Sequence, residues 1–241
     1  IGWALQNANR VQQAFDRSVY MSYEPPEVSP EQRASASAHW DAHGLHSDQF
    51  IATFAGSLGK MFDFGPILNA ARDLREHPEI VFVICGQGSS LDSLREQARD
   101  LPNIRFTGWV TPDRLRVLLE RSAVGLAPYR PLENFERSIT NKPVEYLSYG
   151  LPVLTSLQHG ELPEILSRNH CGRSYLPSGP QSLSRMLAEL QENPGLQVEM
   201  GAAATRTFRA LFHPDQVYGE WIKLIEQVVA ETASSRSLRR P

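Results

Sequence analysis

The stretch from residue 141 to residue 154 holds the side chains best suited to bind a ligand. Asn141, Lys142 and Pro143 are typical of a helix start, and a glycine and a buried apolar run follow. The pattern places the carboxylate of Glu145 in the first turn of this helix. Unpaired amide groups and a partial positive charge at a helix start attract anions such as phosphate. We therefore predict a site for a nucleoside diphosphate, with Glu145 accepting hydrogen bonds from the ribose.

Two glycine-containing turns offer further contacts to such a ligand. Gly56 and Ser57 follow one apolar run, and Lys60 can supply a point charge to a phosphate. Gly108 and Trp109 follow another run, where backbone groups or the indole ring could contact a base. Both turns are expected at the end of a strand, where the backbone can approach a ligand closely.

A long loop over residues 128–138 carries two acids and two arginines, including Glu136 and Arg137. Long loops at the edge of a sheet are often functional, and arginine suits bidentate contacts to phosphate. The alternative is a solvated charged loop.

Each of the other candidates also has a structural explanation that the sequence leaves open. Glu145 could act only on the helix dipole, which is worth about 0.3–1 kcal/mol. Lys60 could be a solvated lysine on a loop, and Trp109 could be a partly buried core aromatic.

The elements that must position these residues follow a regular alternation from residue 51 onward. Short β-branched runs predict strands, and amphipathic segments of about ten residues separate them. Such an alternation predicts an α/β fold, a doubly wound parallel sheet of about six strands that is Rossmann-like, with extra C-terminal helices. Ligands of these sheets bind beyond the carboxyl ends of the strands, where the strand order reverses. The expected strands are 51–55, 80–85, 104–107, 123–127, 152–155 and 172–176.

The sequence before this alternation differs in character. A helical apolar spacing predicts a helix over residues 1–20, prolines then interrupt regular structure, and a polar helix is expected over 31–43. We assign residues 1–49 to an N-terminal helix and linker, 50–230 to the main domain, and 231–241 to a flexible tail. Three C-terminal helices are expected over 181–191, 198–211 and 214–229.

Composition excludes several classes of protein. A net charge of -3 gives no support for nucleic-acid binding through bulk positive charge. No apolar stretch is long enough for a transmembrane segment, although peripheral contact with a membrane stays open. The first residues lack the pattern of a signal peptide, and the two cysteines are expected to be reduced thiols of a cytoplasmic protein. No spacing of ligands predicts a metal, and no cofactor is expected.

Five motifs in register resemble one family. They include the turn at Gly56, the turn at residues 86–88, the segment at Gly108 and the Pro128-Tyr129 strand end. The fifth is Lys142-Pro143-Val144-Glu145-Tyr146-Leu147 with Gly150, Pro152 and Val153. Over about residues 50–229 the chain resembles the C-terminal, donor-binding half of a GT-B fold glycosyltransferase of the retaining group 1 (GT4-like) superfamily.

The resemblance implies roles for individual residues. Glu145 would bind the ribose, Lys60 would neutralise the diphosphate, and backbone amides before the helix would cradle phosphate and sugar. The family pairs Glu145 with an earlier glutamate whose position here is Arg137, and the nearby Glu136 or Glu133 could substitute for it. The implied catalytic residues are Lys60 and Glu136. The implied donor-binding residues are Gly56, Ser57, Gly108, Trp109, Arg137, Ser138, Ile139, Thr140, Asn141, Lys142 and Glu145.

The resemblance covers only part of a whole enzyme of this kind, which has a second Rossmann-like domain for the acceptor. We expect the partners to be a nucleoside diphosphate sugar and a missing N-terminal acceptor domain or partner chain. We also expect the apolar face of the helix over 214–229 to be partly uncovered, unless the helix over residues 1–20 covers it. An alternative from another class is a non-catalytic module that binds a nucleotide sugar and needs a partner for activity. A nicotinamide-binding domain is disfavoured because no GxGxxG turn follows the first strand.

Overall fold

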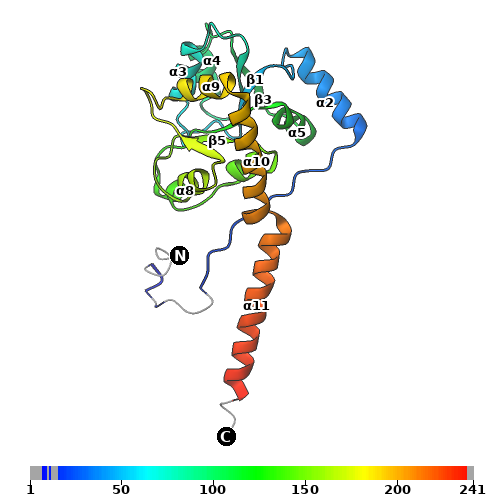
Figure 1. Cartoon of the computed structure of the whole chain (residues 1–241), viewed down its shortest axis with the longest axis vertical. Coiled ribbons are helices and arrows are strands. Elements are labelled where there is room, and N and C mark those ends of the chain that lie inside the picture. Colours follow the sequence, from blue (N-terminus) through cyan, green and yellow to red (C-terminus); the bar gives the residue numbers. More distant parts are fainter. Residues whose placement is uncertain (1–6, 10, 12–15, 238–241) are drawn as a thin grey trace.

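The computed structural model of the chain describes residues 7–9, 11 and 16–237, with side chains described up to residue 230. A six-stranded sheet forms its centre, and every neighbouring pair of strands is parallel. The strand order is β3-β2-β1-β4-β5-β6, so the order reverses between β1 and β4. The predicted doubly wound sheet is confirmed (Figure 1). The strands are β1 (Phe50–Ala55), β2 (Ile80–Cys85), β3 (Ile104–Gly108), β4 (Val124–Ala127), β5 (Val153–Thr155) and β6 (Gly172–Ser174).

Helices connect the strands and cover both faces of the sheet. They are α2 (Pro30–Ala42), α3 (Gly65–Asp73), α4 (Leu91–Gln97), α5 (Pro112–Arg121), α6 (Glu133–Glu136), α7 (Asn141–Ser148), α8 (Glu161–Arg168), α9 (Leu183–Glu192), α10 (Pro194–Leu211) and α11 (Pro214–Ser237). The last helix extends beyond its predicted end at residue 229. The helix predicted over residues 1–20 is wrong for its described end, because residues 16–20 form no helix. Residues 1–6, 10 and 12–15 lie outside the described part.

The side chains of the central strands alternate between two cores. Phe54 and Phe82 lie in the larger core, and Ile51 and Val83 lie in the smaller one. Since β1 and β2 are buried on both faces, they read as continuous apolar runs rather than as alternating ones. Because both strands are held in the core, the positions of the turns that follow them are fixed as well.

The polar helix α2 packs on the smaller core through few residues. Trp40 is fully buried, and its indole Nε1 donates a hydrogen bond of 2.8 Å to the carbonyl of Arg114 in α5. Arg121 adds an ion pair of 2.7 Å to Asp41. Helix α2 carries little apolar surface, so one tryptophan and a few polar contacts hold it on the main domain.

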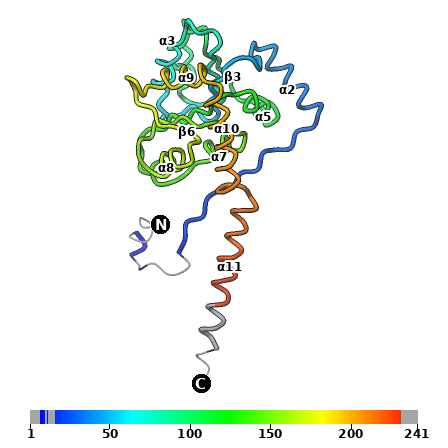
Figure 2. The backbone as a smooth tube through the Cα atoms, in the orientation of Figure 1, coloured from blue at the N-terminus to red at the C-terminus, as the bar shows by residue number. Residues whose placement is uncertain are grey.

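The N-terminal segment, residues 16–29, has no regular secondary structure (Figure 2). Contacts hold it to the main domain at several points. The backbone N–H of Tyr23 donates to the carbonyl of Phe212 over 3.3 Å. The ring of Tyr20 lies 5.1 Å from the ring of Phe212, measured between centroids. Further along, the Arg116 side chain donates to the carbonyl of Pro26. The segment thus runs from the junction of α10 and α11 to α5.

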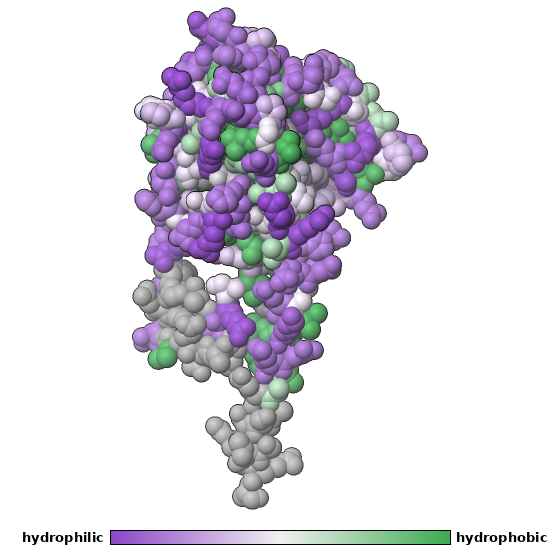
Figure 3. Space-filling model, in the orientation of Figure 1, coloured by the Kyte–Doolittle hydropathy of each residue, from purple (hydrophilic) through white to green (hydrophobic). Residues whose placement is uncertain are grey.

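Helix α11 projects away from the sheet as a long rod (Figures 1 and 2). Val217 at its start is buried, but Trp221, Ile222 and Ile225 are 47%, 57% and 55% exposed. Apolar surface is therefore visible along the rod in Figure 3. Within the described part of the chain, none of the helices has both the length and the apolar character that crossing a bilayer requires.

Candidate functional site

A cavity of about 460 Å³ lies beyond the carboxyl ends of β1, β2 and β3. It lies beside the point where the strand order reverses, the usual ligand site in such sheets. Three strand-end turns and the start of α7 form its walls. The lining residues are Ala55, Gly56, Ser57, Cys85, Gly86, Gln87, Trp109, Val110, Leu115, Asn141, Lys142 and Glu145.

The start of α7 faces this cavity through Asn141 and Lys142. Thr140 is the N-cap residue, but its hydroxyl hydrogen-bonds the hydroxyl of Tyr129 and does not cap the helix. The first amide groups of α7 therefore have no side-chain cap, which leaves the partial positive charge of the helix start available to an anion.

Glu145 lies just beyond the first turn of α7, so its predicted place within that turn is wrong. The helix begins at Asn141, so Glu145 is its fifth residue and follows the first turn. Thr140 takes the N-cap position, so Asn141 is already the first helical residue. The carboxylate consequently lies beside the helix start, where it can reach a group next to a bound phosphate.

Tyr146 fixes α7 on the sheet. Its ring packs directly on Gly125 of β4, where an added Cβ would lie 2.3 Å from a ring carbon. Its hydroxyl accepts a hydrogen bond of 2.9 Å from the backbone N–H of Ala55 at the end of β1. One buried tyrosine therefore connects the two strands at the order reversal with the helix that carries the candidate ligand-binding groups.

The carboxylate of Glu145 is partly buried and already holds one hydrogen bond. The Tyr23 hydroxyl donates to its Oε1 over 2.8 Å. Burial raises the pKa of Glu145, while the Tyr23 hydrogen bond and the charge of Lys142 oppose that rise. Among the described residues, no hydrogen bond engages Oε2 of Glu145, so this oxygen can accept a bond from a ligand.

Lys142 brings a cation into the same cavity. Its Nζ lies 4.8 Å from the ring centroid of Phe62 and 5.6 Å from that of Phe54. A Cβ at Gly56, which has φ 148°, would lie 2.3 Å from this nitrogen. Gly56 therefore makes room for Lys142 in addition to allowing close approach of the backbone. Burial lowers the pKa of Lys142, and Glu145 opposes this effect.

The other predicted site residues divide into two groups. Those that line the cavity are Gly56, Ser57, Trp109, Asn141, Lys142 and Glu145, and those outside its lining are Lys60, Gly108, Glu136, Arg137, Ser138, Ile139 and Thr140. Lys60 is exposed, and its carbonyl accepts a bond of 2.9 Å from Arg130 Nε. Arg137 forms an ion pair of 2.9 Å with Glu133. The roles predicted for these residues stay predictions.

Trp109 is 67% exposed, so the alternative interpretation of this residue as a partly buried core aromatic is wrong. Its exposed ring borders the cavity at the end of β3. Cys85 also lines the cavity, but burial raises the pKa of its thiol to about 11, so the thiolate is disfavoured.

No local feature of the sequence indicates a role for Tyr23. This tyrosine lies in an irregular segment next to prolines, and the residue that it contacts is 122 positions away. Neither periodicity nor motif spacing reports a contact of that kind.

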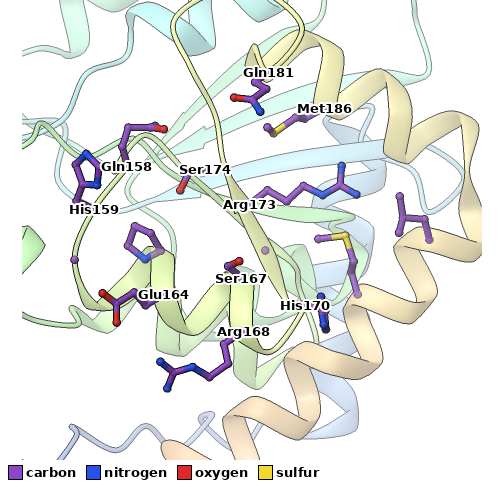
Figure 4. A pocket seen from close by; sticks show the side chains of 15 residues that line it. Gln158, His159, Glu164, Ser167, Arg168, His170, Arg173, Ser174, Gln181 and Met186 are labelled. Atoms are coloured by element: carbon purple, nitrogen blue, oxygen red, sulfur yellow. The ribbon is translucent and has the colours of Figure 1, made fainter.

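A second, larger cavity of about 840 Å³ lies along α8 and β6, and none of the predicted site residues lines it. Figure 4 shows Glu164, Ser167 and Arg168 on α8, with Gln181 and Met186 on the opposite wall. Its polar side chains are spread along the groove, and Arg173 is already paired with Glu189 at 2.8 Å. The smaller cavity is therefore the better candidate. In the part of the chain that the structure describes, no three His, Cys, Asp or Glu side chains form a group that could hold a metal.

Comparisons with known proteins agree with the fold. The model of the family of group 1 glycosyl transferases matches residues 38–207. No curated protein matches the chain.

Several solved structures are similar at low sequence identity, which establishes the fold alone. Sucrose-phosphate synthase from Thermosynechococcus elongatus gives a TM-score of 0.65 at 16% identity, over 88% of this chain and 50% of that one. Anabaena HepE in complex with UDP gives 0.63 at 17%, over 86% and 54%. WaaG, a glycosyltransferase involved in lipopolysaccharide biosynthesis, gives 0.63 at 17%, over 83% and 52%. The chain spans about half the length of these proteins.

Proposed function

Since this chain belongs to the family of group 1 glycosyl transferases, we propose that it is the donor-binding half of a glycosyltransferase. It would bind a nucleoside diphosphate sugar and present the sugar to an acceptor held by another domain. Transfer with retention at the anomeric carbon and a hexose as the sugar are the expectations that the resemblance adds.

One observation carries the proposal: a carboxylate, a cation and an uncapped helix start line a single cavity where the strand order reverses. Lys142 and the start of α7 suit a diphosphate, because both present positive charge to it. Glu145 suits the two vicinal hydroxyls of a ribose. The exposed ring of Trp109 offers a surface on which a base can stack.

The same groups could assist departure of the nucleotide. When the bond between the anomeric carbon and the phosphate oxygen breaks, negative charge grows on that oxygen. A fixed cation such as Lys142 and the amides of a helix start stabilise this charge as it develops, which is an effective form of catalysis. Lys60 and Glu136 keep their predicted catalytic roles as part of the proposal, although neither lines the cavity.

The proposal includes a partner for α11. The chain spans about half the length of similar solved proteins, and the apolar face of α11 is exposed. We infer that this face packs against the acceptor-binding half, in the same polypeptide or in a partner chain.

Uridine nucleotides are the first ligands to test. HepE has been solved in complex with UDP, with UDP and glucose, and with UDP-glucose. UDP-glucose also has both phosphates esterified, so its own charge changes little near neutral pH.

The first prediction concerns Glu145 and uses calorimetric titration. We expect Glu145→Ala to weaken UDP-glucose binding about tenfold or more, because hydrogen bonds from the ribose to a charged acceptor are lost. The analogue of UDP-glucose with a 2′,3′-dideoxyribose should bind wild type weakly. Its affinity should not fall further in Glu145→Ala. Glu164→Ala, which removes an exposed carboxylate beside the other cavity, is the matched control. If Glu145→Ala weakened the binding of UDP-glucose and of the dideoxy analogue equally, Glu145 would not bind the ribose.

A second candidate function is a binding module without turnover of its own. The uncovered face of α11 and the half-length match favour it, because both indicate that other parts of a working enzyme lie elsewhere. Release of UDP from UDP-glucose by the chain alone, measured in a coupled assay and lost in Glu145→Ala, would decide against this candidate.

A further inference from the structure

We propose that the hydroxyl of Tyr23 positions the Glu145 carboxylate for the pentose of the nucleotide, so that the N-terminal segment is part of the donor site. This inference rests on the proposed function. It names a positioning residue that lies outside the matched stretch of residues 38–207.

The geometry separates the two oxygens of the carboxylate. Tyr23 donates to Oε1 over 2.8 Å, and this bond is partly buried. Glu145 lines the cavity whereas Tyr23 does not, so the tyrosine holds the carboxylate without forming part of the cavity wall. A carboxylate held through one oxygen keeps a single orientation, and the ligand does not have to immobilise it on binding.

Tyr23 is itself held firmly enough to act in this way. Its backbone N–H bonds the carbonyl of Phe212, at the junction of α10 and α11. Three residues earlier, the Tyr20 hydroxyl donates to Glu161 Oε1 over 2.7 Å, and the Tyr20 ring packs on Phe212. Contacts to α7, α8 and the end of α10 therefore fix the segment around the hydroxyl.

The groups that face Glu145 come from two elements. Lys142, Tyr146 and Tyr149 share α7 with it, and Tyr23 comes from the N-terminal segment. Burial raises the pKa of all three tyrosines, so each remains a neutral phenol. Lys142 and Tyr23 are the groups that favour the ionised carboxylate, against the effect of burial.

Loss of the Tyr23 bond has a defined sign in a pH titration. The bond favours ionised Glu145, so removing it moves the pKa of Glu145 further upward. Hydrogen bonds from two ribose hydroxyls need the ionised form. Affinity is therefore lost as the pH falls through this pKa, and a variant without the hydroxyl loses affinity at a higher pH than wild type.

The experiment compares Tyr23→Phe with Tyr20→Phe by calorimetric titration of UDP-glucose between about pH 5 and about pH 8. Each variant keeps its ring and removes one hydroxyl bonded to a glutamate, but only Tyr23 contacts Glu145. We expect Tyr23→Phe to bind about tenfold more weakly at neutral pH, with its acid limb moved to higher pH, and Tyr20→Phe to match wild type. Thermal unfolding of both variants checks that they are folded.

A readout through the pentose separates positioning from general damage. With the 2′,3′-dideoxy analogue of UDP-glucose, the gap between wild type and Tyr23→Phe should close. An unchanged affinity and pH profile for Tyr23→Phe, alongside a loss in Glu145→Ala, would overturn the inference and leave the proposed function standing. Tighter binding by Tyr23→Phe would also overturn it, because Tyr23 would then compete with the ligand. No binding by wild type would overturn the proposed function and the inference with it.

Discussion

At the scale of single residues, the two lysines predicted for the site differ in where they lie relative to the cavity. Lys60 was predicted because it follows a glycine turn, but it is exposed and does not line the cavity. Lys142 enters from α7, and the missing side chain of Gly56 leaves space for its amine. The charge therefore lies over two aromatic rings, where it is partly shielded from water and acts more strongly on an anion.

We predict that Lys142→Met weakens UDP-glucose binding about tenfold or more, because the cation is lost while a long apolar side chain remains. The pH dependence has the opposite sign to that of Glu145. Burial lowers the pKa of Lys142, so wild type loses affinity as the pH rises through that value, and the methionine variant lacks this alkaline limb. Calorimetric titration across pH measures both effects.

Lys60→Met is the matched control for Lys142→Met. It removes one charge from an exposed position outside the cavity, so we expect a smaller loss of affinity. A larger loss in Lys60→Met than in Lys142→Met would mean that Lys60 is the main cation for the diphosphate, as the resemblance implies.

Sequence reasoning reached some of these residues and missed others for one physical reason. Asn141, Lys142 and Glu145 belong to one short motif, so their grouping could be predicted from spacing. Tyr23 joins them through a contact that depends on how the whole chain is packed. The sequence also assigned Gly56 to the ligand alone, because it could not show that Lys142 would occupy the adjacent space.

At the scale of elements, the strands were predictable and the helix ends less so. Strands buried on both faces need continuous β-branched and apolar runs, which are visible in the sequence. Ser90 and Thr111 occupy N-cap positions, yet neither side chain caps its helix. The helix expected over residues 1–20 fails at residues 16–20, where tertiary contacts of Tyr20 replace helical hydrogen bonds.

The turn after β1 should be the element most sensitive to added volume. We predict that Gly56→Ala destabilises the fold by about 1–3 kcal/mol and weakens UDP-glucose binding, since the new Cβ would displace the Lys142 amine and the backbone has φ 148°. Denaturant unfolding and calorimetric titration measure the two effects.

Gly59→Ala is the matched control in the same turn. A Cβ at Gly59 would meet no atom within 4 Å, so stability and affinity should both stay near wild type. If Gly56→Ala and Gly59→Ala behaved alike, the space at Gly56 would not be needed by Lys142.

At the scale of the whole molecule, the sheet is covered on both faces, whereas α11 has an exposed apolar face. The sheet buries a continuous core on each face, whereas Trp221, Ile222, Ile225 and Val229 of α11 are exposed in the part of the chain that the structure describes. A projecting apolar helix face marks an interaction surface. The sequence predicts a partly uncovered face here unless residues 1–20 cover it, but it could not show how far the helix would extend from the domain.

We predict that Trp221→Ser combined with Ile225→Ser changes the stability of the chain by no more than about 0.5 kcal/mol, because both side chains are exposed. The same double substitution should lower the fluorescence of a dye that binds apolar surface. Val217→Ala, at the buried start of α11, should instead cost about 1–3 kcal/mol in thermal unfolding. Equal destabilisation by the two variants would mean that the exposed face already packs within the chain.

The contact between Tyr23 and Phe212 also bears on where this protein can be divided for study. Both residues fall outside the stretch that the family model matches, one before its first residue and one after its last. A fragment trimmed to those borders would retain all six strands and the carboxylate of Glu145. It would lack the tether on that carboxylate, so weak ligand affinity in such a fragment would reflect the trimming rather than the native protein.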